Sequence, residues 1–168
     1  MELKELITKI EQWAIDRELD KKATVEAQSI KTAEEMAELI IGISKDNLEV
    51  IKDSIGDVFV TLVIGNMIDE KFDMEEVYKV AKKILGSRDI EEDKRAKIFC
   101  LLQSMMEVIR DDYYYDALFH TIVDLMEVAE TYNLDFTECV QYPYDEIKDR
   151  KGVLKDGQFI KEADLRRK

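Results

Sequence analysis

Four polar side chains that could bind a cation and a phosphate lie at helical spacing early in the chain. They are separated by three, four and three positions, which places them on one helical face: Gln28, Lys31, Glu35 and Glu38. Two glutamates at such spacing are common on solvated helix faces, where they carry no function. This stripe therefore indicates a site only if another element brings further ligands to it.

A second stripe follows at Asp53, Asp57 and Thr61. Asp57 is the only charged residue between Asp53 and Asp69, and its neighbours are apolar. Because a helix that is apolar nearly all round is normally buried, Asp57 is expected to point into the protein. An ionised carboxylate is very costly to bury alone, so it needs a basic residue or a metal ion beside it. A structural and a functional interpretation of this aspartate are equally open at this point.

Packing the two helices side by side would bring Glu35, Glu38 and Asp57 together, with Asp53 close by. Carboxylates gathered in this way repel one another unless hard divalent cations lie between them. Oxygen ligands of this kind suit Mg²⁺ or Mn²⁺. The sequence therefore predicts a metal site formed by these four carboxylates, of which Glu35, Glu38 and Asp57 are the expected catalytic residues.

The elements that must position these side chains are predicted to be helices. Apolar residues recur at helical spacing, and the expected helices cover residues 3–18, 24–43, 46–67, 73–85, 92–110, 115–132 and 135–150. Thr24 is the expected N-cap of the second helix, and Asp46 that of the third.

Two segments have patterns that are typical of strands. The β-branched run at residues 58–64 suggests a strand, but no strand of similar quality is available to pair with it, so a helix is expected. Residues 151–160, with Asp-Gly at 156–157 between short apolar runs, resemble a small hairpin. The predicted fold class is an all-α helical bundle with a short extended C-terminal tail.

Length and composition fit one domain with one core. The chain has 168 residues, and a single proline with six glycines leaves room for long helices. Within this domain, residues 1–85 are the predicted active half, residues 86–150 a second half, and residues 151–168 the tail.

The charge balance excludes some classes of partner. With 38 acidic and 25 basic side chains, the formal net charge is -13. Such a chain does not hold nucleic acid or an anionic membrane by bulk electrostatics. The longest apolar run, at residues 58–65, is too short to span a bilayer. Cys100 and Cys139 lie far apart in a chain with no signal peptide, which predicts a reduced, cytoplasmic protein.

Several short blocks resemble a known family. Glu34-Glu35-Met36-Ala37-Glu38-Leu39, followed by Ile55-Gly56-Asp57-Val58-Phe59, is similar to the ExxE…ExxD signature of MazG-like nucleotide pyrophosphohydrolases, in the all-α NTP pyrophosphatase superfamily. The segments at residues 12–17 and 144–152 look like the phage-encoded branch. The resemblance covers about residues 7–67 and 138–162.

The resemblance implies a fold of the all-α NTP pyrophosphatase type and an activity. That activity is Mg²⁺-dependent hydrolysis of a nucleoside or deoxynucleoside triphosphate to a monophosphate and pyrophosphate. Ser54 stands where the family signature has the first glutamate of ExxD. Asp53, four residues before Asp57, could supply the missing oxygen from the same helix face.

Candidate substrate-binding residues follow from the same comparison. Lys31 is placed to meet a phosphate, and a basic cluster near the end could bind the triphosphate: Lys148, Arg150 and Lys151. Trp13 could stack on the base, although a tryptophan on an apolar stripe is more often a core residue. Arg17 and Gln28 complete the predicted set. No role is predicted for His120, and the run Tyr113-Tyr114-Tyr115 is expected at a helix junction with partly buried rings.

A faint internal repeat is also visible. Residues 72–77 are similar to residues 134–140, and residues 27–40 align with residues 96–109, in which Cys100 replaces Lys31 and Ser104 replaces Glu35. Chance similarity between amphipathic helices explains such matches equally well. If the bundle is a degenerate tandem repeat, residues 92–132 pack where shorter relatives place a second subunit, and association into homo-oligomers stays open.

A non-catalytic interpretation competes with the enzyme. The same helices could form a module that binds a nucleotide or a protein partner without turnover, and Ser54 and the long middle segment keep this interpretation open. Incubation with Mg²⁺ and a panel of nucleoside triphosphates separates the two interpretations.

Overall fold

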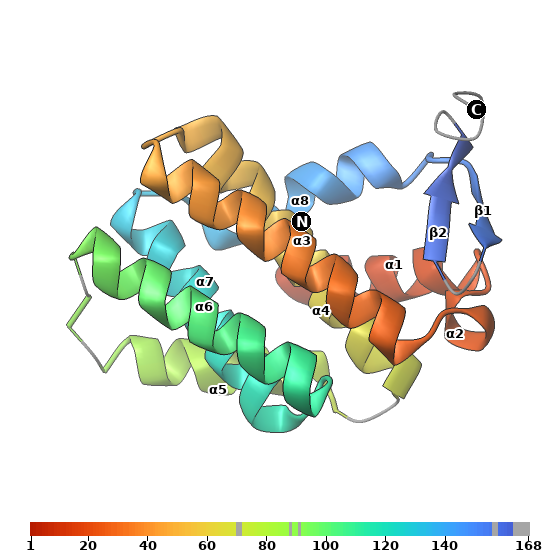
Figure 1. Cartoon of the computed structure of the whole chain (residues 1–168), viewed down its shortest axis with the longest axis horizontal. Coiled ribbons are helices and arrows are strands. Elements are labelled where there is room, and N and C mark those ends of the chain that lie inside the picture. The colour runs from red at the N-terminus through yellow and green to blue at the C-terminus, as the bar shows by residue number, and fades with distance from the viewer. Residues whose placement is uncertain (70–71, 88, 91, 156–157, 163–168) are drawn as a thin grey trace.

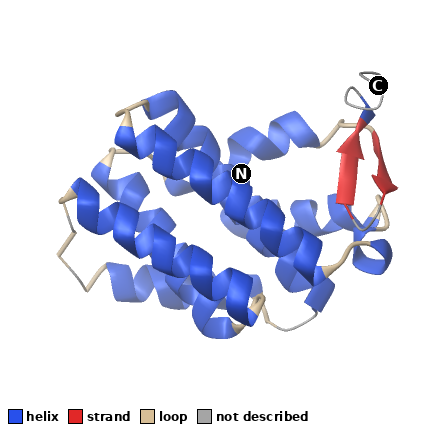
Figure 2. Cartoon of the chain, in the orientation of Figure 1, coloured by secondary structure: helices blue, strands red, loops and turns tan. Residues whose placement is uncertain are grey.

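A computed structural model of the chain describes residues 1–69, 72–87, 89–90, 92–155 and 158–162. Figures 1 and 2 show that helices dominate the described residues. The helices are α1 Leu3–Ile15, α2 Leu19–Lys22, α3 Val25–Ser44, α4 Leu48–Asp69, α5 Met74–Leu85, α6 Lys94–Asp111, α7 Tyr115–Thr131 and α8 Phe136–Ile147. The predicted all-α class is confirmed.

The extended tail is a two-stranded antiparallel hairpin. Strands β1 (Gly152–Lys155) and β2 (Gln158–Lys161) pair with Gly152 opposite Lys161. The predicted turn residues at 156–157 lie outside the described part of the chain. The β-branched run at residues 58–64 is helical, as expected, because it lies inside the long α4.

Two predicted helices are too long, for one shared reason. The helix expected at residues 3–18 ends at Ile15, and that expected at 135–150 ends at Ile147. Arg17 donates hydrogen bonds to the carbonyl oxygens of Trp13 and Arg150, and Trp13 Nε1 donates to that of Ile147. These side chains occupy carbonyls at the ends of both helices, so each chain segment turns there instead of continuing.

The predicted N-cap at Asp46 is wrong. Asp46 adopts a left-handed conformation with a φ of 52° and closes the end of α3, while its carboxylate binds Lys94. The side chain of Asn47 instead accepts a hydrogen bond from the amide of Val50. The predicted cap at Thr24 is confirmed, since its hydroxyl oxygen accepts from the amide of Ala27.

The packing of α3, α4 and α8 resembles that of α6, α7 and α5, as an approximate two-fold axis between the two sets would produce. Helix α3 packs on α4 as α6 packs on α7, and α8 packs on α4 as α5 packs on α7. Helices α3 and α6 lie side by side at the front of Figure 1. Lys94 at the start of α6 binds Asp46, and Tyr113 after its end binds Thr32, so these two helices run antiparallel.

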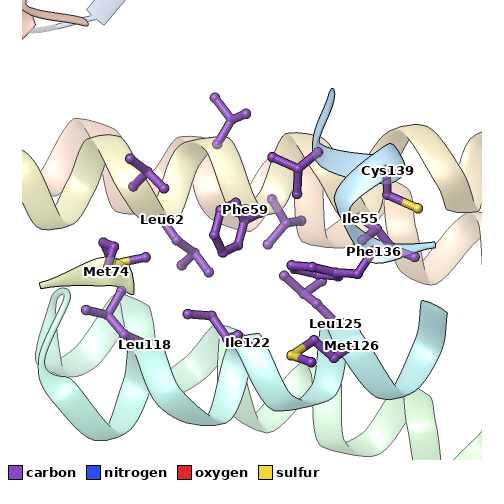
Figure 3. Packing of buried hydrophobic residues seen from close by; sticks show 14 of the residues in the cluster. Ile55, Phe59, Leu62, Met74, Leu118, Ile122, Leu125, Met126, Phe136 and Cys139 are labelled. Atoms are coloured by element: carbon purple, nitrogen blue, oxygen red, sulfur yellow. The ribbon is translucent and has the colours of Figure 1, made fainter. Parts of the chain in front are cut away.

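The core fills the space between these helices. Figure 3 shows residues of α4 facing residues of α7, with α8 beside them. Phe59 meets Phe136 edge to face, with ring centroids 5.4 Å apart, and Leu125 and Ile122 are fully buried.

Within the described residues, no helix is long and apolar enough to cross a membrane.

The tyrosine run lies at the α6–α7 junction, as predicted, but its first ring is fully buried rather than partly so. The Tyr113 hydroxyl lies 2.9 Å from that of Thr32, and the ring fills the space that the absent side chain of Gly65 leaves. Burial raises the pKa of Tyr113, so it stays neutral. This junction therefore fastens α6 and α7 to α3 and α4.

Candidate functional site

A cavity of about 370 Å³ lies between α1, α3, α4 and the C-terminal hairpin. Six of the residues predicted from sequence line it: Trp13, Gln28, Lys31, Glu35, Asp57 and Arg150. The other predicted residues are outside the lining: Arg17, Glu38, Asp53, Lys148 and Lys151. The structure thus gathers parts of both predicted stripes at one place.

Helix α3 presents the first stripe to the cavity. Lys31 Nζ lies 2.6 Å from Glu35 Oε1 and 3.0 Å from Glu34 Oε2. Burial lowers the pKa of Lys31, but the two glutamates outweigh it, so the lysine stays charged. Gln28 Nε2 donates to the carbonyl oxygen of Thr61 and ties α3 to α4 along this wall.

Asp57 is the most perturbed group of the site. Burial, together with the neighbouring carboxylates of Glu35 and Asp53, raises its pKa to about 7 against the opposing effect of Lys31 and Arg150. The charge of Asp57 is therefore only partly compensated by the protein itself. Asp57 is half-buried at the cavity, so the need for a cationic partner that the sequence argument raised applies to a partly desolvated carboxylate.

Asp53 lies on the acidic side of α4. Burial raises its pKa, and so do the nearby charges of Glu146, Glu35, Glu38 and Glu49. Its Oδ1 atom is buried without a hydrogen-bond partner. A buried carboxylate oxygen with no donor, among other carboxylates, is the feature expected of an oxygen ligand that lacks its cation.

The donor set fits a hard divalent cation. Glu35, Asp53 and Asp57 contribute oxygen atoms only, and burial together with neighbouring carboxylates raises the pKa of both Asp53 and Asp57. As they stand, no three acidic, histidine or cysteine side chains of the described residues are close enough to bind one ion together. Glu38 is exposed on α3, where it contributes its charge to Asp53.

The predicted basic cluster is divided by the structure. Arg150 lines the cavity, and its Nη2 lies 3.8 Å from Glu146 Oε2. Lys148 binds Asp145 at 2.7 Å on the surface, and Lys151 is exposed. Arg150 is therefore the one residue of this cluster that the described geometry brings to the carboxylates.

Trp13 and Arg17 form the joint between α1 and the end of α8. Trp13 Nε1 donates to the carbonyl oxygen of Ile147 at 2.7 Å, and the Arg17 guanidinium lies 4.3 Å above the indole ring. Arg17 Nε and Nη2 both donate to the carbonyl oxygen of Arg150. Arg17 thus holds the backbone of the residue that reaches the cavity, and it covers one face of Trp13.

Sequence reasoning missed the apolar wall of the cavity and one carboxylate. The wall comes from several elements: Leu19, Val60, Ile64, Ile147, Phe159 and Ile160. Glu146 on α8 acts on Asp53. The apolar Phe-Ile pair in a polar tail was the only available sequence signal, and nothing in the pattern placed it over α1.

A second polar cluster occupies the equivalent place in the other half. Residues 121–126, Thr-Ile-Val-Asp-Leu-Met, match Ser-Ile-Gly-Asp-Val-Phe at residues 54–59, so Asp124 corresponds to Asp57. Ser104 Oγ donates to Asp124 Oδ2 at 2.5 Å, and His120 Nδ1 lies 2.8 Å from Glu107 Oε2. Burial raises the pKa of Asp124 to about 6, against the hydrogen bond from Ser104.

One stretch of the chain is similar to a known protein. Over 63 residues it is 52% identical to an uncharacterized 18.2 kDa protein in the rep-hol intergenic region of Haemophilus phage HP1. The matched stretch spans 38% of this chain and 39% of the phage protein. No family model and no solved structure matches the chain.

Proposed function

We propose that the chain hydrolyses nucleoside or deoxynucleoside triphosphates to a monophosphate and pyrophosphate, with Mg²⁺ or Mn²⁺ held by Glu35, Glu38, Asp53 and Asp57. The observation that carries this proposal is that Glu35 of α3 and Asp57 of α4 line one cavity together with Lys31 and Arg150, while the charges of Glu35 and Glu38 also act on Asp53, outside the lining. Similarity to the MazG-like signature supports the same reaction.

The lining of the cavity contains charged and apolar side chains, which suit the two parts of a nucleotide. Lys31 and Arg150 supply positive charge beside the carboxylates, where phosphate oxygens would otherwise be repelled. The apolar wall and the edge of Trp13 offer a surface for the nucleoside. A volume of about 370 Å³ lies within the range of small-ligand sites.

The acidic residues have defined parts in this reaction. At neutral pH, with a pKa of about 7, the Asp57 carboxylate is protonated in about half of the molecules, and it gives up that proton when it takes a cation as a ligand. Lys31 holds the Glu35 carboxylate in place through an ion pair of 2.6 Å. When bound, Mg²⁺ supplies a water of lowered pKa and offsets the charge on the phosphate oxygens.

Replacing Glu38 tests the assignment. As a proposed metal ligand, Glu38 is required for turnover, so Glu38→Gln should abolish release of monophosphate and pyrophosphate. Because the side chain is exposed on α3, the helical circular dichroism should stay unchanged. Glu130→Gln, at an exposed glutamate near the end of α7, is the matched control and should keep full turnover. Unchanged activity in Glu38→Gln would contradict the proposed metal site.

The non-catalytic module makes the opposite prediction. The wild-type protein would bind a nucleoside triphosphate, detected by calorimetry with Mg²⁺ present, yet release no product from any nucleotide of the panel. Product release from at least one nucleotide rejects this alternative.

A further inference from the structure

The C-terminal hairpin leaves one edge of β2 free. Within the described residues, β2 pairs with β1 alone. The amide of Glu162 donates to the carbonyl oxygen of Lys151 at 2.9 Å, so these two residues form a hydrogen-bonded pair. Because hydrogen-bonded and non-hydrogen-bonded pairs alternate along an antiparallel ladder, Leu154 and Phe159 form a non-hydrogen-bonded pair. The main-chain N–H and C=O of Phe159 therefore point away from β1.

This free edge faces the cavity of the candidate site. Phe159 and Ile160 both line the cavity, although consecutive side chains of a strand point to opposite faces of a sheet. A cavity that reaches both residues meets the strand at an edge rather than at one face. Since β1 occupies the other edge, the cavity meets the free one, and Figure 1 shows β2 on the side of the hairpin nearer to the helices.

Two polar side chains of the same wall are already hydrogen-bonded within the protein. Trp13 Nε1 donates its single hydrogen to the carbonyl oxygen of Ile147, and the Thr61 hydroxyl donates its own to that of Val58, both at 2.7 Å. Neither side chain has a hydrogen left for a ligand. The main chain of Phe159 supplies the donor that these side chains do not, beside the apolar residues of the wall.

A nucleobase fits a donor and an acceptor that lie side by side. Proteins bind bases through hydrogen bonds to the Watson–Crick edge, while aromatic or apolar side chains cover the faces of the ring. The Phe159 ring lies against Trp13 with centroids 5.6 Å apart, so an aromatic pair adjoins the free edge. A peptide strand is the other common ligand of a free strand edge, but a cavity of about 370 Å³ has the size of a small-molecule site.

We propose that β2 binds the base of the nucleotide substrate through its main chain. The N–H of Phe159 donates to an acceptor on the base, and the C=O of Phe159 accepts from the neighbouring donor of the base. This inference rests on the proposed function, since it names the base-binding part of the same site. Each of the four bases has such a donor beside an acceptor, so the contact orients the base and is open to all four.

Removing the N–H of Phe159 tests the contact. Proline lacks an N–H, and the ladder uses none at this position, so Phe159→Pro keeps the hairpin paired. Phe159→Leu also loses the ring but keeps the N–H, which makes it the matched control. Affinities of the full-length proteins for the four deoxynucleoside monophosphates are measured by calorimetry without divalent cations. Phe159→Pro should bind the best of them at least about tenfold more weakly than Phe159→Leu does.

Leu154→Pro checks that the hairpin tolerates proline at such a position. It removes the N–H that β1 directs to its own outer edge, away from β2. This variant should keep the wild-type affinity and circular dichroism. If it also loses affinity, proline disturbs the hairpin, and the wild-type measurement below decides. Equal affinities of Phe159→Pro and Phe159→Leu, or no binding of any monophosphate by the wild type, overturn the proposal.

A methylated base tests the same contact in the wild-type protein. A methyl group on N1 of a purine or N3 of a pyrimidine blocks the Watson–Crick edge and leaves the sugar and phosphate unchanged. The wild type should bind this form of the best monophosphate at least about tenfold more weakly. Only the unmodified form should shift the amide resonance of Phe159 in protein that is isotope-labelled at phenylalanine.

Equal affinities for the methylated and unmodified forms overturn the proposal. These measurements need neither turnover nor a metal ion, so an inactive protein would refute the proposed function and leave this result intact.

Discussion

At the scale of single residues, Asp57 shows what sequence can and cannot predict. A lone acid in an apolar helix is visible in the sequence, and its burial follows from the helix around it. The role of Arg150, as opposed to Lys148 or Lys151, was not predictable. It depends on where the chain turns after α8, which the contacts of Arg17 and Trp13 decide.

The pKa of Asp57 predicts a pH-dependent stability. Its folded-state pKa of about 7 exceeds the ordinary value of 3.8, so the protonated form stabilises the fold. This stabilisation is full below about pH 4 and is lost as the pH rises through 7. The shift corresponds to at most about 4 kcal/mol of unfolding free energy, and less where solvent reaches the carboxylate. Asp57→Asn should therefore match the wild type near pH 4 and exceed it near pH 8.

Urea unfolding between pH 4 and 8, without divalent cations, measures this difference. Other carboxylates with a raised pKa, such as Asp53 and Asp124, are present in both proteins, so the difference between the two curves isolates Asp57. A difference that does not change with pH would show that this carboxylate is not desolvated in the folded protein.

Cation binding should also be visible without turnover. If the carboxylates bind Mg²⁺, the ion stabilises the wild type at pH 8 by about 2.7 kcal/mol at a concentration of 100 times the dissociation constant. Asp53→Asn should lose most of this gain, because the unpartnered Oδ1 of Asp53 is replaced or reoriented. Thermal unfolding with Mg²⁺, and with NaCl at equal ionic strength, measures it. Equal gains in both proteins would remove Asp53 from the ligand set.

At the scale of elements, local signals located the helices but not all of their ends. Amphipathic spacing and the cap at Thr24 are properties of short segments, and the structure contains this cap. The ends at Ile15 and Ile147 depend on side chains that bind carbonyls more than 130 residues away. Such contacts exist only after folding, so a local pattern cannot contain them.

The close approach of α4 and α8 predicts a sensitive glycine. A Cβ at Gly56 would lie 2.0 Å from the carbonyl oxygen of Cys139 and 2.6 Å from Cγ of Pro143. Gly56→Ala should therefore push α8 away from α4 and cost about 1–3 kcal/mol of unfolding free energy. Because α8 leads to Arg150, the same change should weaken nucleotide binding.

Gly86→Ala is the matched control for this prediction. A Cβ at Gly86 would meet nothing closer than 3.5 Å, and the residue has a helical φ of -63°. This variant should be neutral or more stable by about 0.4–1 kcal/mol. Urea denaturation of both variants checks the contrast, and equal stabilities would show that α8 adjusts without cost.

At the scale of the whole molecule, the packing pattern relates the two halves more closely than the sequence did. Chance and a true repeat explained the alignment of residues 27–40 with 96–109 equally well. In the structure, α3 packs on α4 as α6 packs on α7, and α8 packs on α4 as α5 packs on α7. The second cluster then pairs its carboxylates with a hydroxyl and an imidazole, at Ser104 and His120. Sequence reasoning gave His120 no role because no cysteine or histidine lies at ligand spacing from it. The α6–α7 pairing that brings Glu107 to His120 is not visible in the sequence. The division into an active and a second half stays a prediction.

The shared core predicts that both halves unfold together. Leu125 on α7 is fully buried in the core that α4 also lines (Figure 3). Leu125→Ala should therefore lower the unfolding free energy of the entire chain by about 2–5 kcal/mol. Trp13 is the single tryptophan and lies 8% exposed at the proposed site, so its fluorescence reports the active half. Its transition in urea should shift together with the circular dichroism of all helices.

A leucine on the surface supplies the control for this experiment. Leu48 is 50% exposed at the start of α4, and Leu48→Ala should change the unfolding free energy by no more than about 0.5 kcal/mol. If Leu125→Ala separates the two signals, so that Trp13 keeps its wild-type midpoint while part of the helical signal is lost earlier, the halves are independent folding units. If the Trp13 fluorescence and the circular dichroism keep the same midpoint, residues of α7 far from the cavity contribute to the stability of the site. The reason is that α7 packs against α4, the helix that carries Asp53 and Asp57.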